Sequence, residues 1–332
     1  MKNKIITLNK RPVGKPTMAD FAFQEEEMPK AGAGEILLKT KYVSVDPYLR
    51  GRMNDTKSYA PSFKLQHPIQ SGIVAEVVES QNDHFQKGSF VSGILEWKEY
   101  QTTRGEGLMP VDPKAASLSA YLGILGMTGL TAYLGLMEIG KPKSGETLFV
   151  SGAAGAVGSV VGQIGKILGC RVVGIAGTDE KVALLKNKFG FDEALNYKTT
   201  PELKKAIANA CPDGIDVYFD NVGGEISDDV MASMNRLGRI IVCGAISLYN
   251  ETEIPMGPRV QPMLITKSLL MQGFIVSNYA DKFQPAIQQL SSWLKEGKLV
   301  YEETVIEGFD KIPEAFIGLF EGKNEGKMIV KI

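Results

Sequence analysis

Histidine and cysteine are scarce in this sequence of 332 residues, which holds two histidines and three cysteines. Neither His67 nor His84 stands at a metal-ligand spacing from a cysteine or a glutamate. The cysteines are scattered, without any C-x-x-C pair, at Cys170, Cys211 and Cys243. Zinc sites and disulfide frameworks both leave recognisable spacings in a sequence. The sequence therefore predicts no metal site, and it predicts free cysteines that pack in the interior.

An excess of charge of one sign is also missing, since 37 lysines and arginines stand against 38 aspartates and glutamates. Proteins that bind nucleic acid or anionic lipid usually carry a net positive field. No apolar run approaches the roughly 20 residues that a membrane-spanning helix needs. The N-terminal segment also lacks the apolar core of a signal peptide. We therefore expect neither nucleic acid nor a membrane as a partner, and a location in the cytoplasm.

The order of strand and helix patterns predicts two kinds of architecture in one chain. Residues 34–111 hold short runs rich in valine, isoleucine and tyrosine, broken by glycine, proline and asparagine, which is typical of a β-rich domain. A helical pattern follows at residues 115–136. Beyond it, helical stretches alternate with apolar, β-branched runs at residues 147–152, 171–177, 214–223 and 238–247. This alternation predicts an α/β fold with a doubly wound parallel sheet.

The C-terminal run, residues 326–332, has a strand pattern but is too short to form a domain alone. We therefore expect it to return to the β-rich part. The predicted domains are a β-rich substrate domain, residues 1–124 and 305–332, and a dinucleotide-binding domain, residues 125–304.

A glycine-rich turn stands between a strand pattern and a helical pattern within residues 147–169. It reads Ala153-x-Gly155-x-x-Gly158, so it departs from the G-x-G-x-x-G fingerprint at its first position. Small residues let the backbone approach a pyrophosphate, and the helix N-terminus offers free N–H groups to it. Alone, the glycines could mark only a tight turn. The strand before them and the helix after them predict a nucleotide site.

The second strand pattern, residues 171–177, indicates which dinucleotide binds. Folds that prefer NAD end this strand with an acidic residue that binds the ribose hydroxyls. Here the strand ends at Ala176 and Gly177, followed by Thr178, without a carboxylate at the tip. Lys181 follows in the next helical stretch, where it could pair with a 2′-phosphate or be an ordinary surface lysine. The sequence therefore favours NADP(H) over NAD(H).

The motifs GMTGLTAY, SGAAGAVGS, DNVGG and VCGAIS, together with DPYLRGRM upstream, resemble one family over nearly the whole chain. It is the zinc-independent branch of the medium-chain dehydrogenases and reductases, with prostaglandin reductases, alkenal double-bond reductases and bacterial curcumin reductase. Zinc alcohol dehydrogenases of the same superfamily have a cysteine and a Gly-His-Glu where this chain reads VDPYLR and IQSG. The resemblance implies a GroES-like catalytic domain and a Rossmann domain. It also implies NADPH-dependent reduction of the carbon–carbon double bond of small α,β-unsaturated ketones and aldehydes.

The resemblance further implies a set of cofactor-binding positions. Those implied at the pyrophosphate and the adenosine phosphate are Gly155, Ala156, Val157, Gly158, Lys181 and Tyr197. Those implied elsewhere on the cofactor, chiefly at the ribose and nicotinamide, are Met127, Thr128, Asn221, Cys243, Gly244, Ala245, Ile246, Phe274, Val276 and Asn324. Without the resemblance, Asn221 and Asn324 read as turn residues and Cys243 as a small core residue.

Tyr249 and Tyr48 are the candidate catalytic residues, implied at the substrate mouth. A hydride that reaches the β-carbon pushes charge onto the carbonyl oxygen, and without a metal a hydroxyl, an amide or a water must stabilise that charge. Tyr249 is the first candidate, Tyr48 the second and a ribose hydroxyl of the cofactor the third. Each tyrosine could instead be a packing or surface residue.

Two other functions stay open at this point. One is an NADPH:quinone oxidoreductase, and the other, from a different class, is an NADPH-binding scaffold without turnover. The apolar run at residues 269–276 could pair across a two-fold axis, so a homodimer is the expected state. The run could also be the last strand of its own sheet.

Overall fold

The computed structural model describes residues 2–332, which form two compact units. Unit 1 runs to Gly123 and includes Glu303–Asn324 and Met328–Ile332, and unit 2 comprises Ile124–Glu302 and Glu325–Lys327. The boundaries between the two domains predicted from the sequence are at residues 124/125 and 304/305. None of the helices in the described range is both long and apolar enough to cross a membrane.

Unit 1 is built mainly on a mixed sheet with the strand order β14-β15-β3-β4-β5-β7, in which β6 also pairs with β3. Its strands are β3 (Ile36–Ser44), β4 (Gln70–Ser80), β5 (Phe90–Glu96), β6 (Tyr100–Thr103), β7 (Met109–Val111), β14 (Glu303–Glu307) and β15 (Lys327–Lys331). A separate antiparallel pair is β1 (Lys2–Leu8) with β2 (Phe21–Glu27). The helices are α1 (Leu49–Arg52), α9 (Ile312–Leu319), η1 (Met18–Asp20), η2 (Leu118–Leu122) and η6 (Phe309–Lys311).

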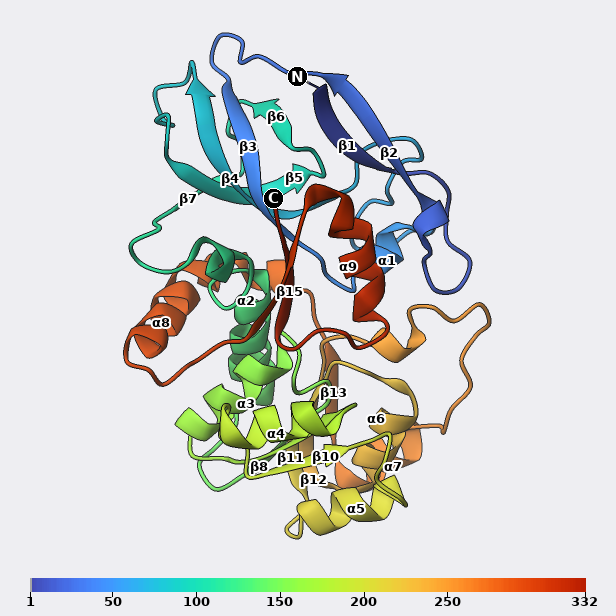
Figure 1. Ribbon diagram of the computed structural model, residues 1–332. Coiled ribbons are helices and arrows are strands. Elements are labelled where there is room, and N and C mark those ends of the chain that lie inside the picture. Colours follow the sequence, from blue (N-terminus) through green and yellow to red (C-terminus); the bar gives the residue numbers. More distant parts are fainter. Residues whose placement is uncertain (1) are drawn as a thin grey trace. The chain divides into compact units, whose positions relative to one another are not determined.

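The C-terminal strand β15 pairs antiparallel with β3, with Val330 opposite Val43 (Figure 1). The expected return of the C-terminus to the β-rich part is therefore confirmed. Trp97 is fully buried in the core of this unit, where its ring stacks on Phe21. Its indole N–H donates to the Ser71 hydroxyl at 2.8 Å, so the one polar atom of the ring is satisfied.

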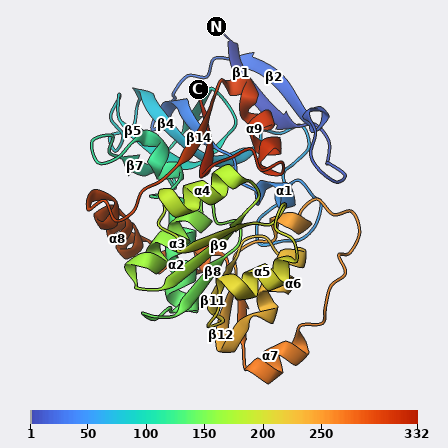
Figure 2. The same cartoon turned by 60° about the horizontal axis from the view of Figure 1, so that its bottom comes forward.

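Unit 2 is a doubly wound α/β unit with six parallel strands in the order β10-β9-β8-β11-β12-β13. Figure 2 labels the strands β9, β8, β11 and β12 of this sheet. The strands are β8 (Thr147–Val150), β9 (Arg171–Ala176), β10 (Glu193–Asn196), β11 (Ile215–Asp220), β12 (Met234–Val242) and β13 (Leu270–Gly273). Its α-helices are α2 (Met127–Leu134), α3 (Gly158–Ile167), α4 (Asp179–Asn187), α5 (Leu203–Ala210), α6 (Gly224–Ala232), α7 (Gln261–Lys267) and α8 (Phe283–Lys295). Its other helical segments are η3 (Gly135–Gly140), η4 (Ile246–Leu248) and η5 (Val276–Lys282).

The strand order places a topological switch point between β8 and β11, because the chain leaves β8 toward one edge of the sheet and later returns to its other side. Ligands of such sheets bind beyond the carboxyl ends of the strands at this point. All four residues of β8 are buried, as a strand covered on both faces requires. The predicted α/β fold class is confirmed.

Two predicted elements differ from the structure. The helical pattern at residues 115–136 is broken at Gly123 and Gly126 into η2 and α2, and η3 continues α2 as a π-helix. Gly126 has an extended backbone, which a helix interior excludes. The strand expected at residues 269–276 ends already at Gly273, where its pairing with Val242 of β12 ends.

Candidate functional site

The glycine-rich turn connects β8 to the start of α3 at the carboxyl edge of the parallel sheet. Ala153 donates its backbone N–H to the Ile175 carbonyl of β9 at 3.1 Å, which ties the turn to the neighbouring strand. A Cβ atom on Gly158 would lie 2.4 Å from the Gly152 carbonyl oxygen. Only glycine therefore fits at this last position, and the turn brings its backbone and the N-terminus of α3 together as a pyrophosphate site requires.

Lys181 and Tyr197 lie around the carboxyl end of β9. The Thr178 hydroxyl accepts the Lys181 backbone N–H at 3.3 Å and so caps α4. A Cβ atom on Gly177 would lie 2.9 Å from the Tyr197 hydroxyl, so the tyrosine packs directly against this glycine. Lys198, which the sequence reasoning missed, lies next to Tyr197 and repels the Lys181 ammonium. Two lysines near one strand tip make a positive site that suits a 2′-phosphate.

The pKa of Lys181 is lowered from its ordinary value, chiefly because the side chain is partly buried. The Lys198 charge lowers it further, and the Glu325 carboxylate opposes both effects. Glu325 begins a short segment directly after the predicted Asn324. Glu325 itself was not among the predicted site residues, because its place beside the glycine-rich turn arises only in the fold.

That segment, Glu325–Lys327, packs against the glycine-rich turn within unit 2. The Gly326 N–H donates to the Ala154 carbonyl at 2.8 Å, and Gly326 forms a parallel bridge with Gly155. The Lys327 N–H donates to the Glu302 carbonyl at 2.9 Å. The C-terminal part of the chain therefore contributes backbone to the dinucleotide turn.

Asn221 follows β11, and Cys243–Ile246 follow β12, at neighbouring strand ends. The Asn221 amide nitrogen donates to the Ser151 carbonyl at 2.7 Å, which fixes the amide plane. The backbone N–H groups of Cys243 and Gly244 donate to the Asp220 carbonyl at 2.8 and 3.1 Å. These bonds bring together two of the segments predicted to line the ribose and nicotinamide.

Burial and the Asp220 charge raise the pKa of the Cys243 thiol to about 12. The sulfur therefore stays protonated at neutral pH, which supports its reading as a packing residue rather than a nucleophile.

Tyr249 follows η4, and its hydroxyl accepts the Ala245 backbone N–H at 3.2 Å. The hydrogen of this hydroxyl has no acceptor within residues 2–332. Burial raises the pKa of Tyr249, so the group stays protonated at neutral pH. Tyr249 can therefore donate a hydrogen bond to a ligand while its oxygen is held by the backbone.

Met127 and Thr128 form the start of α2, and Phe274 and Val276 follow β13. Val276 packs against Leu130 and Leu134 of α2, so these two segments lie together in unit 2. A Cβ atom on Gly135 would lie 2.6 Å from the Phe274 ring, which places that ring against the glycine where η3 begins.

Tyr48 and Asn324 belong to unit 1. Tyr48 precedes α1 and packs against the core of that unit, and burial beside Asp46 raises the pKa of its hydroxyl. Asn324 is the residue directly before the Glu325–Lys327 segment.

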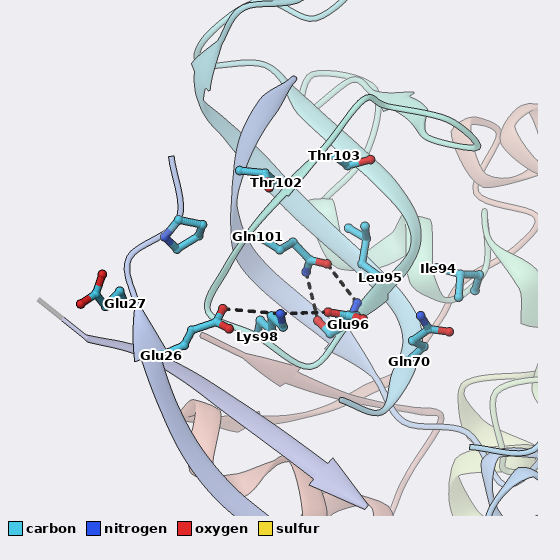
Figure 3. Close-up of a pocket in the computed structure, with 11 residues that line it drawn as sticks. Glu26, Glu27, Gln70, Ile94, Leu95, Glu96, Lys98, Gln101, Thr102 and Thr103 are labelled. Carbon is cyan, nitrogen blue, oxygen red and sulfur yellow. Dashed lines mark hydrogen bonds and ion pairs between the residues drawn. The ribbon is translucent and has the colours of Figure 1, made fainter. Parts of the chain in front are cut away.

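A separate cavity of about 520 Å³ lies in unit 1 and is lined by none of the predicted site residues (Figure 3). Several of its polar groups bond to one another. The Lys98 ammonium lies 3.4 Å from Glu26 and 3.1 Å from Glu96, and the Gln101 amide bonds the Glu96 backbone. Nothing in this cavity matches the chemistry predicted from the sequence.

The residues of unit 2 fit a dinucleotide with a 2′-phosphate. The glycine turn could accept a pyrophosphate and the two lysines a phosphate, and the ends of β11 and β12 offer polar backbone and the Asn221 amide. Within residues 2–332, no three histidine, cysteine or acidic side chains are grouped so that they could hold a metal ion.

Comparison with known proteins gives two family matches. Residues 4–111 match the family described as the N-terminal domain of oxidoreductase, and residues 156–292 match the family described as zinc-binding dehydrogenase. Mouse (Mus musculus) prostaglandin reductase 1 is 48% identical over 98% of this chain and 98% of its own length. The NADPH-dependent curcumin reductase of Escherichia coli K12 is 41% identical over 100% of this chain and 97% of its own length. The crystal structure of CurA from Vibrio vulnificus in complex with NADPH has a TM-score of 0.94 at 43% identity, covering 99% of this chain and 98% of that one.

Proposed function

The chain belongs to the zinc-independent medium-chain reductase family that includes prostaglandin reductase 1 and curcumin reductase, and from that membership we propose that it reduces α,β-unsaturated carbonyl compounds with NADPH. The substrates proposed are small enones, 2-alkenals and compounds like 15-oxo-prostaglandins. The observation that carries the proposal is the strand tip at Ala176–Thr178, which has no carboxylate and has Lys181 and Lys198 beside it. This arrangement selects a 2′-phosphorylated cofactor.

We propose the predicted cofactor residues as the binding site. Gly155, Ala156, Val157 and Gly158 would cover the pyrophosphate, and Lys181 with Tyr197 would hold the adenosine phosphate end. The ribose and nicotinamide would be lined by Met127, Thr128, Asn221, Cys243, Gly244, Ala245, Ile246, Phe274 and Val276, with Asn324 as a further contact. The hydrogen bonds at the ends of β8, β11 and β12 support this assignment, because they hold these segments in one arrangement.

NADPH, when bound, supplies the hydride that reaches the β-carbon of the substrate. Tyr249 would donate its hydroxyl hydrogen to the carbonyl oxygen and stabilise the charge that develops there. Its raised pKa suits this role, because a protonated phenol is a donor and a phenolate is not. The α-carbon then takes a proton from solvent or through the same hydroxyl. Tyr48 remains the second candidate for the donor.

We further propose that the protein is a homodimer that acts in the cytoplasm. β13 is an edge strand whose outer side carries no partner within residues 2–332, and Leu270 on it is 45% exposed. An exposed apolar edge strand favours pairing with a second copy across a two-fold axis. The free thiols of Cys170, Cys211 and Cys243 suit a reducing compartment.

The reaction is tested by following the near-ultraviolet absorbance of NADPH with purified protein. A medium-chain 2-alkenal, an aryl enone and a simple quinone serve as parallel substrates, and NADH replaces NADPH as the control. Fast oxidation of NADPH with the alkenal and the enone, and slow oxidation with NADH, is expected. Turnover only with the quinone would support a quinone oxidoreductase instead. Binding of NADPH without any turnover would support a scaffold.

A further inference from the structure

Asp220 ends β11 and is only 3% exposed, so its carboxylate lies inside unit 2. One carboxylate oxygen, Oδ1, accepts four hydrogen bonds. The donors are the hydroxyls of Ser151 at 2.9 Å and Tyr218 at 2.8 Å, and the backbone N–H groups of Val222 at 3.0 Å and Gly223 at 2.9 Å. A buried carboxylate with four donors is held firmly in place, because moving it would leave several buried polar groups without hydrogen-bond partners.

Asp220 orients Asn221 through Ser151. The Ser151 hydroxyl donates to Asp220 and accepts the Asn221 backbone N–H at 2.9 Å. The Asn221 amide nitrogen then donates to the Ser151 carbonyl at 2.7 Å. The amide oxygen of Asn221 has no donor within residues 2–332, so it is left to accept a hydrogen bond from a ligand.

The same corner of the fold also holds the segment 243–249, which contains Tyr249. The Asp220 carbonyl accepts the N–H groups of Cys243 and Gly244. The Val222 carbonyl, in the turn that the Asp220 carboxylate closes, accepts the Ser247 N–H at 3.1 Å and the Ser247 hydroxyl at 2.6 Å. A displaced turn would therefore displace this segment as well.

We propose that Asp220 is a positioning residue for the nicotinamide end of the cofactor, which fixes Asn221 and the segment 243–249 through Ser151 and the turn at Val222. The proposal rests on the proposed function. It adds the residue that holds Asn221 and the segment 243–249 in fixed positions relative to each other. Small displacements of groups that hold reactants are costly, because hydride transfer depends on close and aligned approach.

Replacing Asp220 with asparagine tests its hydrogen-bond geometry separately from its charge. No donor within residues 2–332 reaches Oδ2. An amide with its oxygen at Oδ1 and its NH₂ group at Oδ2 can therefore keep all four hydrogen bonds and lose only the negative charge. Alanine at the same position removes all four.

The test compares Asp220→Asn, Asp220→Ala and the wild-type protein in three measurements: the Kd of NADPH from its fluorescence, kcat and KM for an enone, and the thermal midpoint. In Asp220→Ala we expect the Kd to rise and kcat to fall by about tenfold or more, with a smaller change in the enone KM. In Asp220→Asn we expect the Kd of NADPH and kcat to stay within about threefold of their wild-type values. The matched control is Ile215→Val, at the opposite end of β11, which should lower the thermal midpoint and leave kcat unchanged.

Wild-type Kd and kcat in Asp220→Ala would overturn the proposal, and so would equal losses in the alanine and asparagine variants. If Asp220→Ala does not fold, the Ser151→Ala variant tests the proposal instead. It removes the hydroxyl that links Asp220 to Asn221, so it should also raise the Kd of NADPH. An unchanged Kd in that variant would contradict the proposal. A wild-type protein that binds NADPH but reduces no enone would refute the proposed reaction, and the Kd comparison would still decide the role of Asp220.

Discussion

At the scale of single residues, Lys181 is the residue that we propose for the preference for NADPH, and its surroundings decide at which pH it is charged. The sequence predicted this lysine from its place after a strand tip without a carboxylate. It could not predict Lys198 or Glu325, because both reach the site through other elements of the fold. Partial burial is the main reason why this lysine in the first turn of α4 has a lowered pKa, and the Glu325 carboxylate and the Lys198 ammonium act on it in opposite directions.

Replacing Lys181 with methionine should weaken NADPH binding by about tenfold or more, because a charge-assisted contact with the phosphate is lost. Binding of NADH, which has no 2′-phosphate, should stay the same. Fluorescence titration with both cofactors measures the effect. Lys186→Met is the matched control, since Lys186 lies on the same helix and pairs with the exposed Glu193. Equal weakening of NADH binding would show that Lys181 does not read the phosphate.

The lowered pKa of Lys181 also predicts a pH dependence. The ammonium form binds the phosphate, so the preference for NADPH over NADH should fall as pH rises through the pKa of Lys181. Because that pKa is lowered, the fall should begin at a lower pH than an exposed lysine would give. Titrations of both cofactors across the alkaline range measure it. A preference that stays constant until an ordinary lysine deprotonates would contradict this assignment.

Tyr249→Phe should lower kcat by about tenfold or more and leave the Kd of NADPH nearly unchanged, because it removes the proposed donor to the carbonyl oxygen. Steady-state kinetics with an enone measure the first quantity and fluorescence the second. Tyr133→Phe, which removes a hydroxyl elsewhere in unit 2, should leave both unchanged. Full activity in Tyr249→Phe would transfer the role to Tyr48 or to the cofactor.

At the scale of elements, the sequence predicted those elements whose conformation depends on residues close together in the chain. The strand, glycine turn and helix from β8 to α3 follow from apolar residues and from glycines such as Gly158, where a Cβ atom does not fit. The Asp220 network was missed, because Ser151 and Asp220 stand 69 residues apart and only the parallel sheet brings them together. The helical pattern at residues 115–136 does form helical segments, but Gly123 and Gly126 leave helical geometry and divide it.

The Glu325–Lys327 segment gives a test at this scale. Gly326 has a φ of 63°, and a Cβ atom there would lie 1.9 Å from the Glu302 carbonyl oxygen. Gly326→Ala should therefore displace the segment from the glycine turn and weaken NADPH binding. Gly297→Ala is the matched control, because Gly297 has a φ of 68° with open space around it.

Both variants should lose about 1 kcal/mol of unfolding free energy from the positive φ, and Gly326→Ala more than that. Only Gly326→Ala should bind NADPH more weakly. Chemical denaturation and fluorescence titration measure the two effects. Equal NADPH affinity in the two variants would show that the segment does not support the dinucleotide turn.

At the scale of the whole molecule, the open edge of β13 carries the proposed dimer. Leu270→Lys places a charge on this edge, where it should prevent pairing with a second copy, so sedimentation should report a monomer. The matched control is Val305→Lys, on the edge strand β14 of the other sheet, where the exposed fraction of the side chain is 44% against 45% for Leu270. A wild-type protein that sediments as a monomer would contradict the dimer, and a dimer in Leu270→Lys would place its interface elsewhere.

Above all, we propose that the protein delivers a hydride to a carbon–carbon double bond. The most direct test uses NADPH with deuterium at both C4 positions of the nicotinamide and an aryl enone, followed by NMR of the product. We expect a saturated ketone with one deuterium on the β-carbon and an intact carbonyl group. Deuterium on the carbonyl carbon of an allylic alcohol would contradict it, because the hydride would then have reached the other end of the conjugated system.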